Sequence, residues 1–124
     1  MKTLLMFPGQ GSQYIGMGKD IYEKYDYAKK AFQQVNEALG EDLTKLIFEG
    51  DEAELKKSYN TQPALMAVSV AVYLALKEQY GSKFDELNIQ GVAGHSLGEY
   101  SALCVAGGLS IGETAKILRK KLVR

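Results

Sequence analysis

Two short apolar runs mark the predicted strands of a small sheet. Residues 3–7 are largely apolar and stop at Pro8-Gly9, and Ile89–Ala93 lead into a glycine-rich turn. A short apolar run that ends at glycine or proline is typical of a buried β-strand entering a loop. The sequence therefore predicts strands over Thr3–Phe7 and Ile89–Ala93.

Between these runs, apolar residues recur at helical spacing. Within residues 19–39 they lie three and four positions apart, on one helix face: Ile21, Tyr25, Ala28, Phe32, Val35 and Leu39. This pattern predicts a single helix that stops at Gly40. Two shorter helices are expected over Asp42–Phe48 and Asp51–Lys57, the second with Asp51 as its N-cap.

The following segment is apolar on nearly all sides. Thr61 is expected to cap a helix over Ala64–Tyr80, with Pro63 in the entry turn, where its missing N–H is not needed. A helix without a polar stripe is expected to be buried. Gly81 is expected to end it.

After the second strand the pattern predicts a tight turn over Gly94–Gly98, a helix over Glu99–Ala106 and a last helix over Ile111–Val123 capped by Ser110. These elements indicate an α/β fold, with a short parallel sheet flanked by helices in one domain over residues 1–124. Two strands make a poor sheet on their own, so we expect the chain to be part of a larger domain.

Composition and charge exclude several classes of partner. Hydrophobic residues make up 46% of the 124 residues and charged residues 24%, as in ordinary globular domains. Fifteen basic residues balance fifteen acidic ones, so nothing favours nucleic acid or an anionic membrane. The apolar N-terminal run is too short to span a membrane and lacks a signal-peptide cleavage site, so a cytoplasmic protein is expected. The one cysteine, Cys104, allows no internal disulfide and is expected to be buried.

The strongest chemical signal is Gly94-His95-Ser96-Leu97-Gly98, which fits the pattern G-x-S-x-G between a strand and a helix. Such a turn exposes the serine Oγ above the sheet, and the glycines relieve clashes in the sharp bend. The N–H of Leu97, at the start of the helix, can stabilise an oxyanion. The sequence thus predicts a nucleophilic Ser96. A glycine-rich turn that serves packing alone is the alternative.

A second glycine-rich loop, Pro8-Gly9-Gln10-Gly11, follows the first strand directly. Loops at the carboxyl ends of parallel strands form the active-site crevice of α/β sheets. The backbone N–H of Gln10 is therefore a candidate second donor to the oxyanion. A flexible glycine loop is the alternative, and a nucleotide loop is disfavoured because neither G-x-G-x-x-G nor G-K-[ST] is present.

Three motifs stand out together: Phe7-Pro8-Gly9-Gln10-Gly11-Ser12-Gln13, Asn60-Thr61-Gln62-Pro63-Ala64 and the stretch from Gly94 through Leu103. In this order they resemble the malonyl-CoA:acyl-carrier-protein transacylases of fatty-acid synthesis and the similar acyltransferase domains of polyketide synthases. The family's proteins are considerably longer, so the chain resembles their N-terminal part.

The resemblance implies a hydrolase-like strand–elbow–helix and a ping-pong reaction. Ser96 would take malonyl from coenzyme A, and the N–H groups of Gln10 and Leu97 would form the oxyanion hole. The acyl group would pass to the phosphopantetheine thiol of an acyl carrier protein. No metal or redox cofactor is implied.

Two departures from the family pattern matter. The family's general base is a histidine far downstream, whereas the only histidine here, His95, adjoins Ser96 on a turn that points neighbouring side chains apart. The chain alone is therefore expected to be inactive or nearly so unless a second segment or chain completes the site. The family also binds the malonyl carboxylate with an arginine. A gapless alignment puts Lys121 at that position, and a two-residue deletion puts Arg119 there.

Two other functions stay open from the sequence. An acyl hydrolase on the same framework would transfer the acyl group to water, and a cation such as Lys121 or Arg119 near the acyl carboxylate argues for malonyl transfer instead. A non-catalytic module that binds acyl-CoA or carrier protein would account for the missing base.

Overall fold

The computed structural model describes residues 3–7, 13–85, 89–94, 101–102 and 104–122. Its elements are β1 (Thr3–Phe7), α1 (Lys19–Lys24), α2 (Asp26–Leu39), α3 (Leu43–Glu49), α4 (Glu52–Leu55), α5 (Ser58–Tyr80), α6 (Ser82–Asp85), β2 (Ile89–Gly94) and α8 (Ile111–Leu122). Residues 101–102 and 104–105 are also helical. The turn and helix start predicted over residues 95–100 lie outside the described residues.

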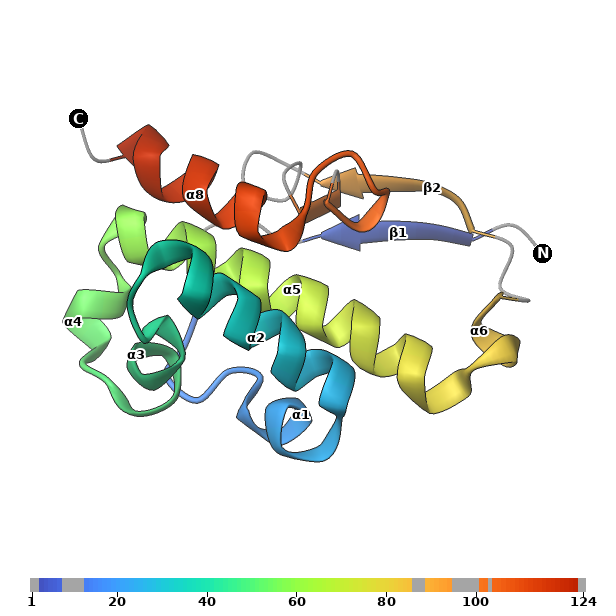
Figure 1. Ribbon diagram of the computed structural model, residues 1–124, viewed down its shortest axis with the longest axis horizontal. Helices are drawn as coiled ribbons and strands as arrows, with labels where there is room; N and C mark the ends of the chain where they lie inside the picture. Colours follow the sequence, from blue (N-terminus) through green and yellow to red (C-terminus); the bar gives the residue numbers. More distant parts are fainter. Residues whose placement is uncertain (1–2, 8–12, 86–88, 95–100, 103, 123–124) are drawn as a thin grey trace.

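The strands β1 and β2 lie side by side and run in the same direction (Figure 1). Their parallel register pairs Leu4 with Gly91 and Phe7 with Gly94. Because the last residues of the two parallel strands are partners, the chain leaves both strands at the same end of the sheet, their carboxyl end.

Helices α2, α5 and α8 pack against one another and form the body of the structure (Figure 1). Their facing apolar residues form one core, which includes Ala31, Phe32, Val35, Met66, Ala67, Val70, Ala115 and Leu118. Burying a side chain the size of Leu118 contributes about 1.5–3 kcal/mol. The predicted apolar face of residues 19–39 is used here, since Ala28, Phe32 and Val35 are all buried.

The predicted helix ends that depend on local capping are confirmed. Gly40 ends α2 in the left-handed conformation, with φ 68°. The Asp51 carboxylate accepts a hydrogen bond from the N–H of Ala53 at 2.9 Å, at the start of α4. The Ser110 hydroxyl accepts one from the N–H of Glu113 at 3.1 Å, at the start of α8.

The prediction of one helix over residues 19–39 is wrong, because the chain breaks at Tyr25 into α1 and α2. Tyr25 is extended, with φ −118° and ψ 126°, and its hydroxyl donates to Gln79 Oε1 at 2.8 Å. The N–H of Tyr27, in the first turn of α2, donates to Glu78 Oε1 at 2.7 Å. A carboxylate from α5 thus caps α2, which compensates for the interruption of the helical hydrogen bonds.

The prediction that Thr61 caps the fifth helix is also wrong. Helix α5 begins at Ser58, and Thr61 lies inside it, fully buried. The Thr61 hydroxyl donates to the carbonyl of Leu55, in α4, and to that of Lys57 at 3.1 Å. The residue therefore ties α5 to α4 from within the helix.

Helix α5 is buried mainly over its first half. Residues Asn60 to Ala67 are buried, but three apolar residues four positions apart, Val72, Leu76 and Tyr80, are 41–50% exposed. The prediction that this helix is buried because it is apolar on nearly all sides therefore holds for its first half and not for its second half. In the described part of the chain, no helix is long and apolar enough to cross a membrane.

An aromatic cluster holds α1, α2 and α3 together. The rings of Tyr22, Phe32 and Phe48 meet edge to face with centroids 5.3–5.6 Å apart. Gly18, just before α1, has φ 79°, and a Cβ there would lie 3.1 Å from Phe32 Cζ. The glycine therefore provides both the left-handed turn and the space for the Phe32 ring.

We expect Gly18→Ala to destabilise the chain more than Gly16→Ala. Gly16 has a similar φ of 91°, but no atom lies within 4 Å of the place that a methyl group would take, so alanine there adds only backbone strain, about 1–2 kcal/mol. Gly18→Ala adds a displacement of Phe32 to the same strain. Urea denaturation of the two variants measures both losses. Equal losses would contradict a role for Gly18 in packing against Phe32.

Candidate active site

The sequence-predicted nucleophile and oxyanion donors, Ser96, Leu97 and Gln10, lie outside the described residues. Lys121 lies in α8, but its side chain is likewise not described. Arg119 is the one candidate site residue whose side chain the structure describes. The site is therefore built here from the elements that carry these residues.

The sheet register bears directly on Gln10 and Ser96. Phe7 and Gly94 are partners at the ends of β1 and β2, and the segments that carry Gln10 and Ser96 begin immediately after them. Both segments therefore follow the carboxyl ends of neighbouring parallel strands. In α/β sheets, ligand-binding and active sites form at this end of the strands.

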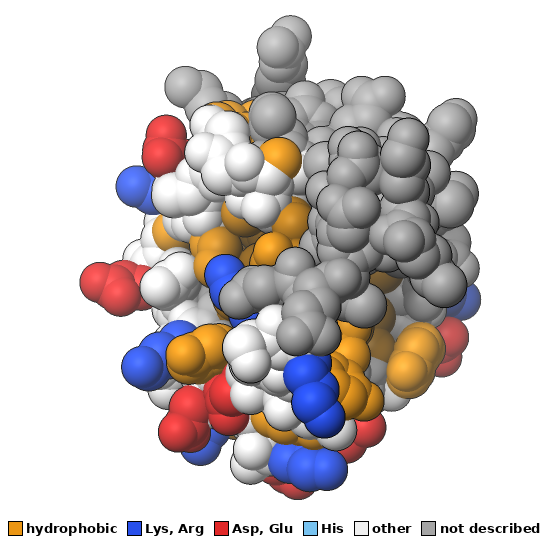
Figure 2. Space-filling view, turned by 90° about the vertical axis from the view of Figure 1, so that its right-hand side faces the viewer, with side chains coloured by type: hydrophobic (Ala, Val, Ile, Leu, Met, Phe, Trp, Pro, Cys, Tyr) orange, Lys and Arg blue, Asp and Glu red, His pale blue; other side chains and the backbone are white. Residues whose placement is uncertain are grey.

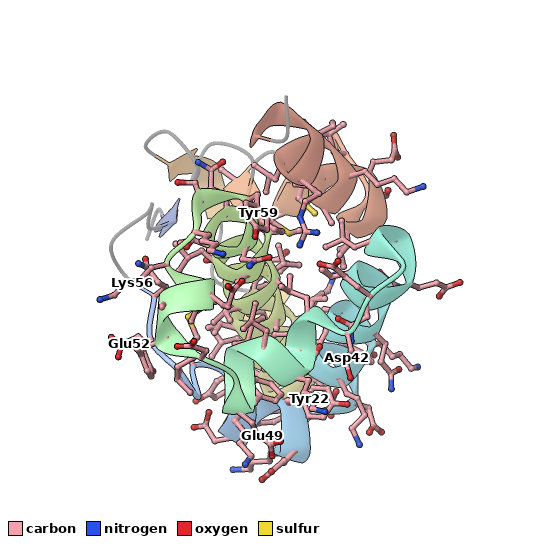
Figure 3. The ribbon with its side chains drawn as sticks, turned by 90° about the vertical axis from the view of Figure 1, so that its left-hand side faces the viewer. Tyr22, Asp42, Glu49, Glu52, Lys56 and Tyr59 are labelled. Carbon is pink, nitrogen blue, oxygen red and sulfur yellow. The ribbon has the colours of Figure 1, made fainter. Side chains whose placement is uncertain are left out.

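Arg119 ties α8 to the start of α5. Its Nε donates to the carbonyl oxygen of Tyr59 at 2.9 Å, and its Nη2 donates to Asn60 Oδ1 at 3.2 Å. The guanidinium carbon lies 5.6 Å from the centroid of the Tyr59 ring. Figure 3 shows Tyr59 at the start of α5, beside α8. The Arg119 side chain is only 20% exposed, so these contacts are largely shielded from water.

The Tyr59 carbonyl is available to Arg119 because of Pro63. A helical carbonyl normally accepts from the N–H four residues later, but Pro63 has none, so the Tyr59 carbonyl lacks this usual donor. The Arg119 guanidinium supplies that donor from a position 60 residues further along the chain. A proline six residues into a helix is thereby tolerated because a side chain from another helix satisfies the freed acceptor.

Asn60 extends this contact to α4. Its Nδ2 donates to the carbonyl of Glu54 at 3.0 Å, while its Oδ1 accepts from Arg119. The Asn60 side chain is buried, and both ends of its amide are used. The motif Asn60-Thr61-Gln62-Pro63 thus joins α4, α5 and α8, a structural role that the sequence reasoning missed. The signal available in the sequence was Pro63 itself, which frees a carbonyl.

Arg119 also has a charged partner. Its Nη2 forms an ion pair with the carboxylate of Glu41, which follows α2. Glu41 is 45% exposed, so solvent screens this pair and it adds less than the shielded contacts with Tyr59 and Asn60.

The only cysteine is a poor candidate nucleophile. Cys104 is buried, as the sequence predicted, and its burial raises the pKa of the thiol, with a hydrogen bond involving Thr114 acting in the opposite direction. A thiol with a raised pKa stays protonated at neutral pH and reacts poorly. Among the described residues, no group of three or more His, Cys, Asp or Glu is placed to hold a metal ion.

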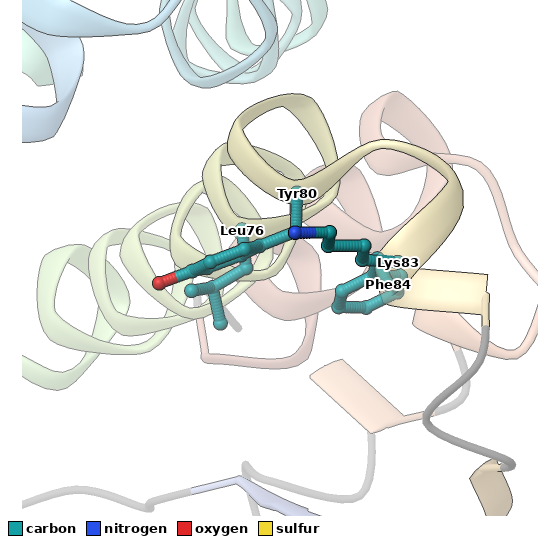
Figure 4. Close-up of a pocket in the computed structure, with 4 residues that line it drawn as sticks. All are labelled: Leu76, Tyr80, Lys83 and Phe84. Atoms are coloured by element: carbon teal, nitrogen blue, oxygen red, sulfur yellow. The ribbon is translucent and has the colours of Figure 1, made fainter.

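An apolar pocket lies at the other end of α5. It is lined by Leu76, Tyr80, Lys83 and Phe84 (Figure 4). Figure 2 shows this end of the molecule, where apolar side chains are exposed among charged ones. The pocket lies roughly 30 Å along α5 from Tyr59, so it is separate from the Arg119 contacts.

We expect the cost of removing Arg119 to depend on Pro63. Arg119→Met removes the guanidinium donor from the Tyr59 carbonyl and should lower the free energy of unfolding by about 1–3 kcal/mol. In a Pro63→Ala background the helix itself supplies an N–H to that carbonyl, so the loss should be about 1 kcal/mol smaller.

Urea denaturation of the original chain, the two single variants and the double variant measures this coupling. Glu41→Gln is the matched control, and we expect a change within about 0.5 kcal/mol because that pair is exposed. The same loss for Arg119→Met in both backgrounds would rule out the pairing of Arg119 with the carbonyl that Pro63 frees.

Comparison with known proteins identifies relatives along nearly the whole chain. Residues 4–124 match the family model described as acyl transferase domain. A Bacillus subtilis protein named malonyl CoA-acyl carrier protein transacylase is 48% identical over 120 residues, which are 97% of this chain and 36% of the relative. A protein of the same name from Haemophilus influenzae is 46% identical over 99% of this chain and 39% of its own length.

Solved structures agree with this result. An acyl-carrier-protein-S-malonyltransferase from Bartonella henselae superimposes with a TM-score of 0.86 at 50% identity, over 95% of this chain and 37% of the other. A malonyl-transacylase solved in complex with a type II polyketide synthase acyl-carrier protein has a TM-score of 0.86 at 37% identity, over 98% of this chain and 38% of the other.

The chain thus spans a little over a third of the length of these relatives. The family match runs from the first strand to the end of the sequence and includes every element that carries a candidate site residue. This chain belongs to the acyl transferase domain family.

Proposed function

We propose that this chain is the nucleophile-bearing, N-terminal part of an acyltransferase domain that moves malonyl from coenzyme A to the phosphopantetheine thiol of an acyl carrier protein. The names of relatives 46–48% identical to it support this substrate and this acceptor. The observation that carries the proposal is the parallel pairing of Phe7 with Gly94, because both motif loops leave the sheet from those residues.

The proposed chemistry uses a serine ester as intermediate. Ser96 Oγ attacks the thioester carbonyl, its proton goes to a base, and the N–H groups of Gln10 and Leu97 stabilise the oxyanion. Coenzyme A then leaves as a thiol with that proton. The carrier thiol attacks the ester in the same way, which restores Ser96 and forms the new thioester. The reaction needs neither metal nor redox cofactor, and the resemblance assigns the base to a histidine that matches no residue of this chain.

We assign the malonyl carboxylate to Lys121 rather than to Arg119. The Arg119 guanidinium already donates to Tyr59 and Asn60 and pairs with Glu41. Lys121 stands at the position that a gapless alignment gives to the family's arginine. Lysine supplies the charge without the two-pronged geometry of arginine, so it fits a single carboxylate oxygen.

The proposal also covers the fold of the whole domain and the location of the protein in the cell. The pair β1–β2 is proposed to be one portion of a larger parallel sheet, with a nucleophile elbow after β2. The same proposal places residues 1–124 in a single acyltransferase domain. A cytoplasmic location is consistent with one free, buried thiol.

A chimaera tests this function. Residues 1–124 would replace the matching segment of the Bacillus subtilis relative, whose remaining length is expected, from the family resemblance, to supply the missing histidine. We expect transfer of malonyl from malonyl-CoA to the carrier protein, with a malonyl ester on Ser96 detected by mass spectrometry. Ser96→Ala should abolish the ester and lower the rate by on the order of 10⁶, as loss of the serine does in a serine protease.

Ser101→Ala is the matched control, because Ser101 belongs to the same motif but is fully buried in the structure. It should keep the ester. A folded chimaera that forms the ester equally well without Ser96 would overturn the assignment of the nucleophile. Release of free malonate in place of malonyl carrier protein would identify a hydrolase instead.

A further inference from the structure

Helix α8 carries three cationic residues near its C-terminal end, Arg119, Lys120 and Lys121, and among them Arg119 is the one whose side-chain contacts the structure describes. We propose that Arg119 is a positioning residue: it fixes the last turn of α8 on α5 so that Lys121 is presented to the carboxylate of the malonyl group. This inference rests on the function proposed above and adds to it a residue that controls acyl selectivity without touching the substrate.

The position of Lys121 explains the need for such an anchor. Lys121 is the second-last residue of α8, which ends at Leu122, and terminal helical turns fray when nothing holds them. Arg119 lies within the same last turn. Its contacts reach acceptors on α5 that are themselves buried or fixed by the helix, Asn60 Oδ1 and the Tyr59 carbonyl.

Helix geometry separates Arg119 from Lys121. Successive residues turn by about 100° around a helix, so positions 119 and 121 lie about 200° apart. Arg119 contacts α5 from one flank of α8, and the backbone position of Lys121 lies on the opposite flank, on the side that also carries the buried residues Thr114 and Leu118. An anchor on the first flank therefore sets the rotation of the second flank.

The chemistry of lysine makes this rotation important. An arginine can bind a carboxylate through several donors, so it tolerates some displacement, whereas an ammonium group is a single point charge on a flexible stem. Its attraction to the carboxylate depends on where the helix backbone places the stem. Loss of the anchor should therefore affect substrates that carry a carboxylate and spare those that do not.

The test compares malonyl-CoA with acetyl-CoA in the chimaera described above. Arg119→Lys keeps the charge but lacks the fork that serves both Tyr59 and Asn60. We expect the ratio of kcat/KM for malonyl-CoA to that for acetyl-CoA to fall about tenfold, within the range of couplings measured between interacting residues. The rate with acetyl-CoA should change little.

Lys121→Met supplies the second arm. It removes the charge and should itself reduce the malonyl preference. Adding Arg119→Lys to Lys121→Met should lower the ratio no further, because the residue through which Arg119 acts is already absent. Glu41→Gln is the matched control, since it removes only the exposed partner of Arg119 and should leave the ratio unchanged.

Each outcome decides between explanations. Equal losses with both substrates in Arg119→Lys would overturn the positioning role and leave Arg119 as a purely structural residue. So would a further fall in the ratio when Arg119→Lys is added to Lys121→Met. If Arg119→Lys does not fold, Asn60→Ala removes one acceptor of the same anchor and must lower the ratio for the inference to hold. A chimaera with no malonyl preference before any substitution would instead refute the proposed function.

Discussion

The carbonyl of Tyr59 is the constraint on which the arrangement of α5 and α8 depends. Pro63 removes the N–H that would normally satisfy this partly buried carbonyl, and a carbonyl that is shielded from water without a donor costs on the order of 1–3 kcal/mol. Arg119 supplies the donor from α8 at 2.9 Å. Pro63 thus leaves a carbonyl on one helix without its usual donor, and the donor that Arg119 supplies requires a second helix docked in one orientation. Hydrophobic packing alone would allow α8 to rotate or slide on α5, since apolar contacts have little directionality.

The contact of Arg119 with the start of α5 is part of a junction between three helices. Asn60 and Thr61 donate hydrogen bonds to the carbonyls of Glu54 and Leu55, so that α4, α5 and α8 meet within a few residues. All of these acceptors are backbone or amide oxygens with fixed positions. A junction of this kind is stiffer than one made by exposed ion pairs, because its geometry is set by the helices themselves and water competes less for its donors.

Sequence reasoning succeeded where the physical signal was local. The caps at Gly40, Asp51 and Ser110 each depend on atoms within a few residues, and all three were predicted. It failed where the partner was distant in the sequence. The break at Tyr25 depends on Glu78 and Gln79, more than 50 residues away, and no periodicity in residues 19–39 reveals them. The contacts of Arg119 were missed for the same reason, since their partners lie 59 and 60 residues away in the sequence, although Pro63 already indicated a carbonyl without its usual donor. Ser96, Gln10 and Leu97 stay predictions that the strand register supports.

In the proposed function, Arg119 and Lys121 of α8 have separate roles that follow from their chemistry. Two acceptors fixed in space, a carbonyl and an amide oxygen, suit the rigid fork of a guanidinium, and Arg119 is engaged with both. An acceptor that arrives with a substrate is mobile until bound, and a flexible ammonium can follow it. If Arg119 bound the substrate instead, the Tyr59 carbonyl would lose its donor whenever malonyl entered, and each turnover would disturb the α5–α8 contact. The assignment of Lys121 to the substrate avoids this conflict, because the structural contact and the substrate contact then use separate side chains.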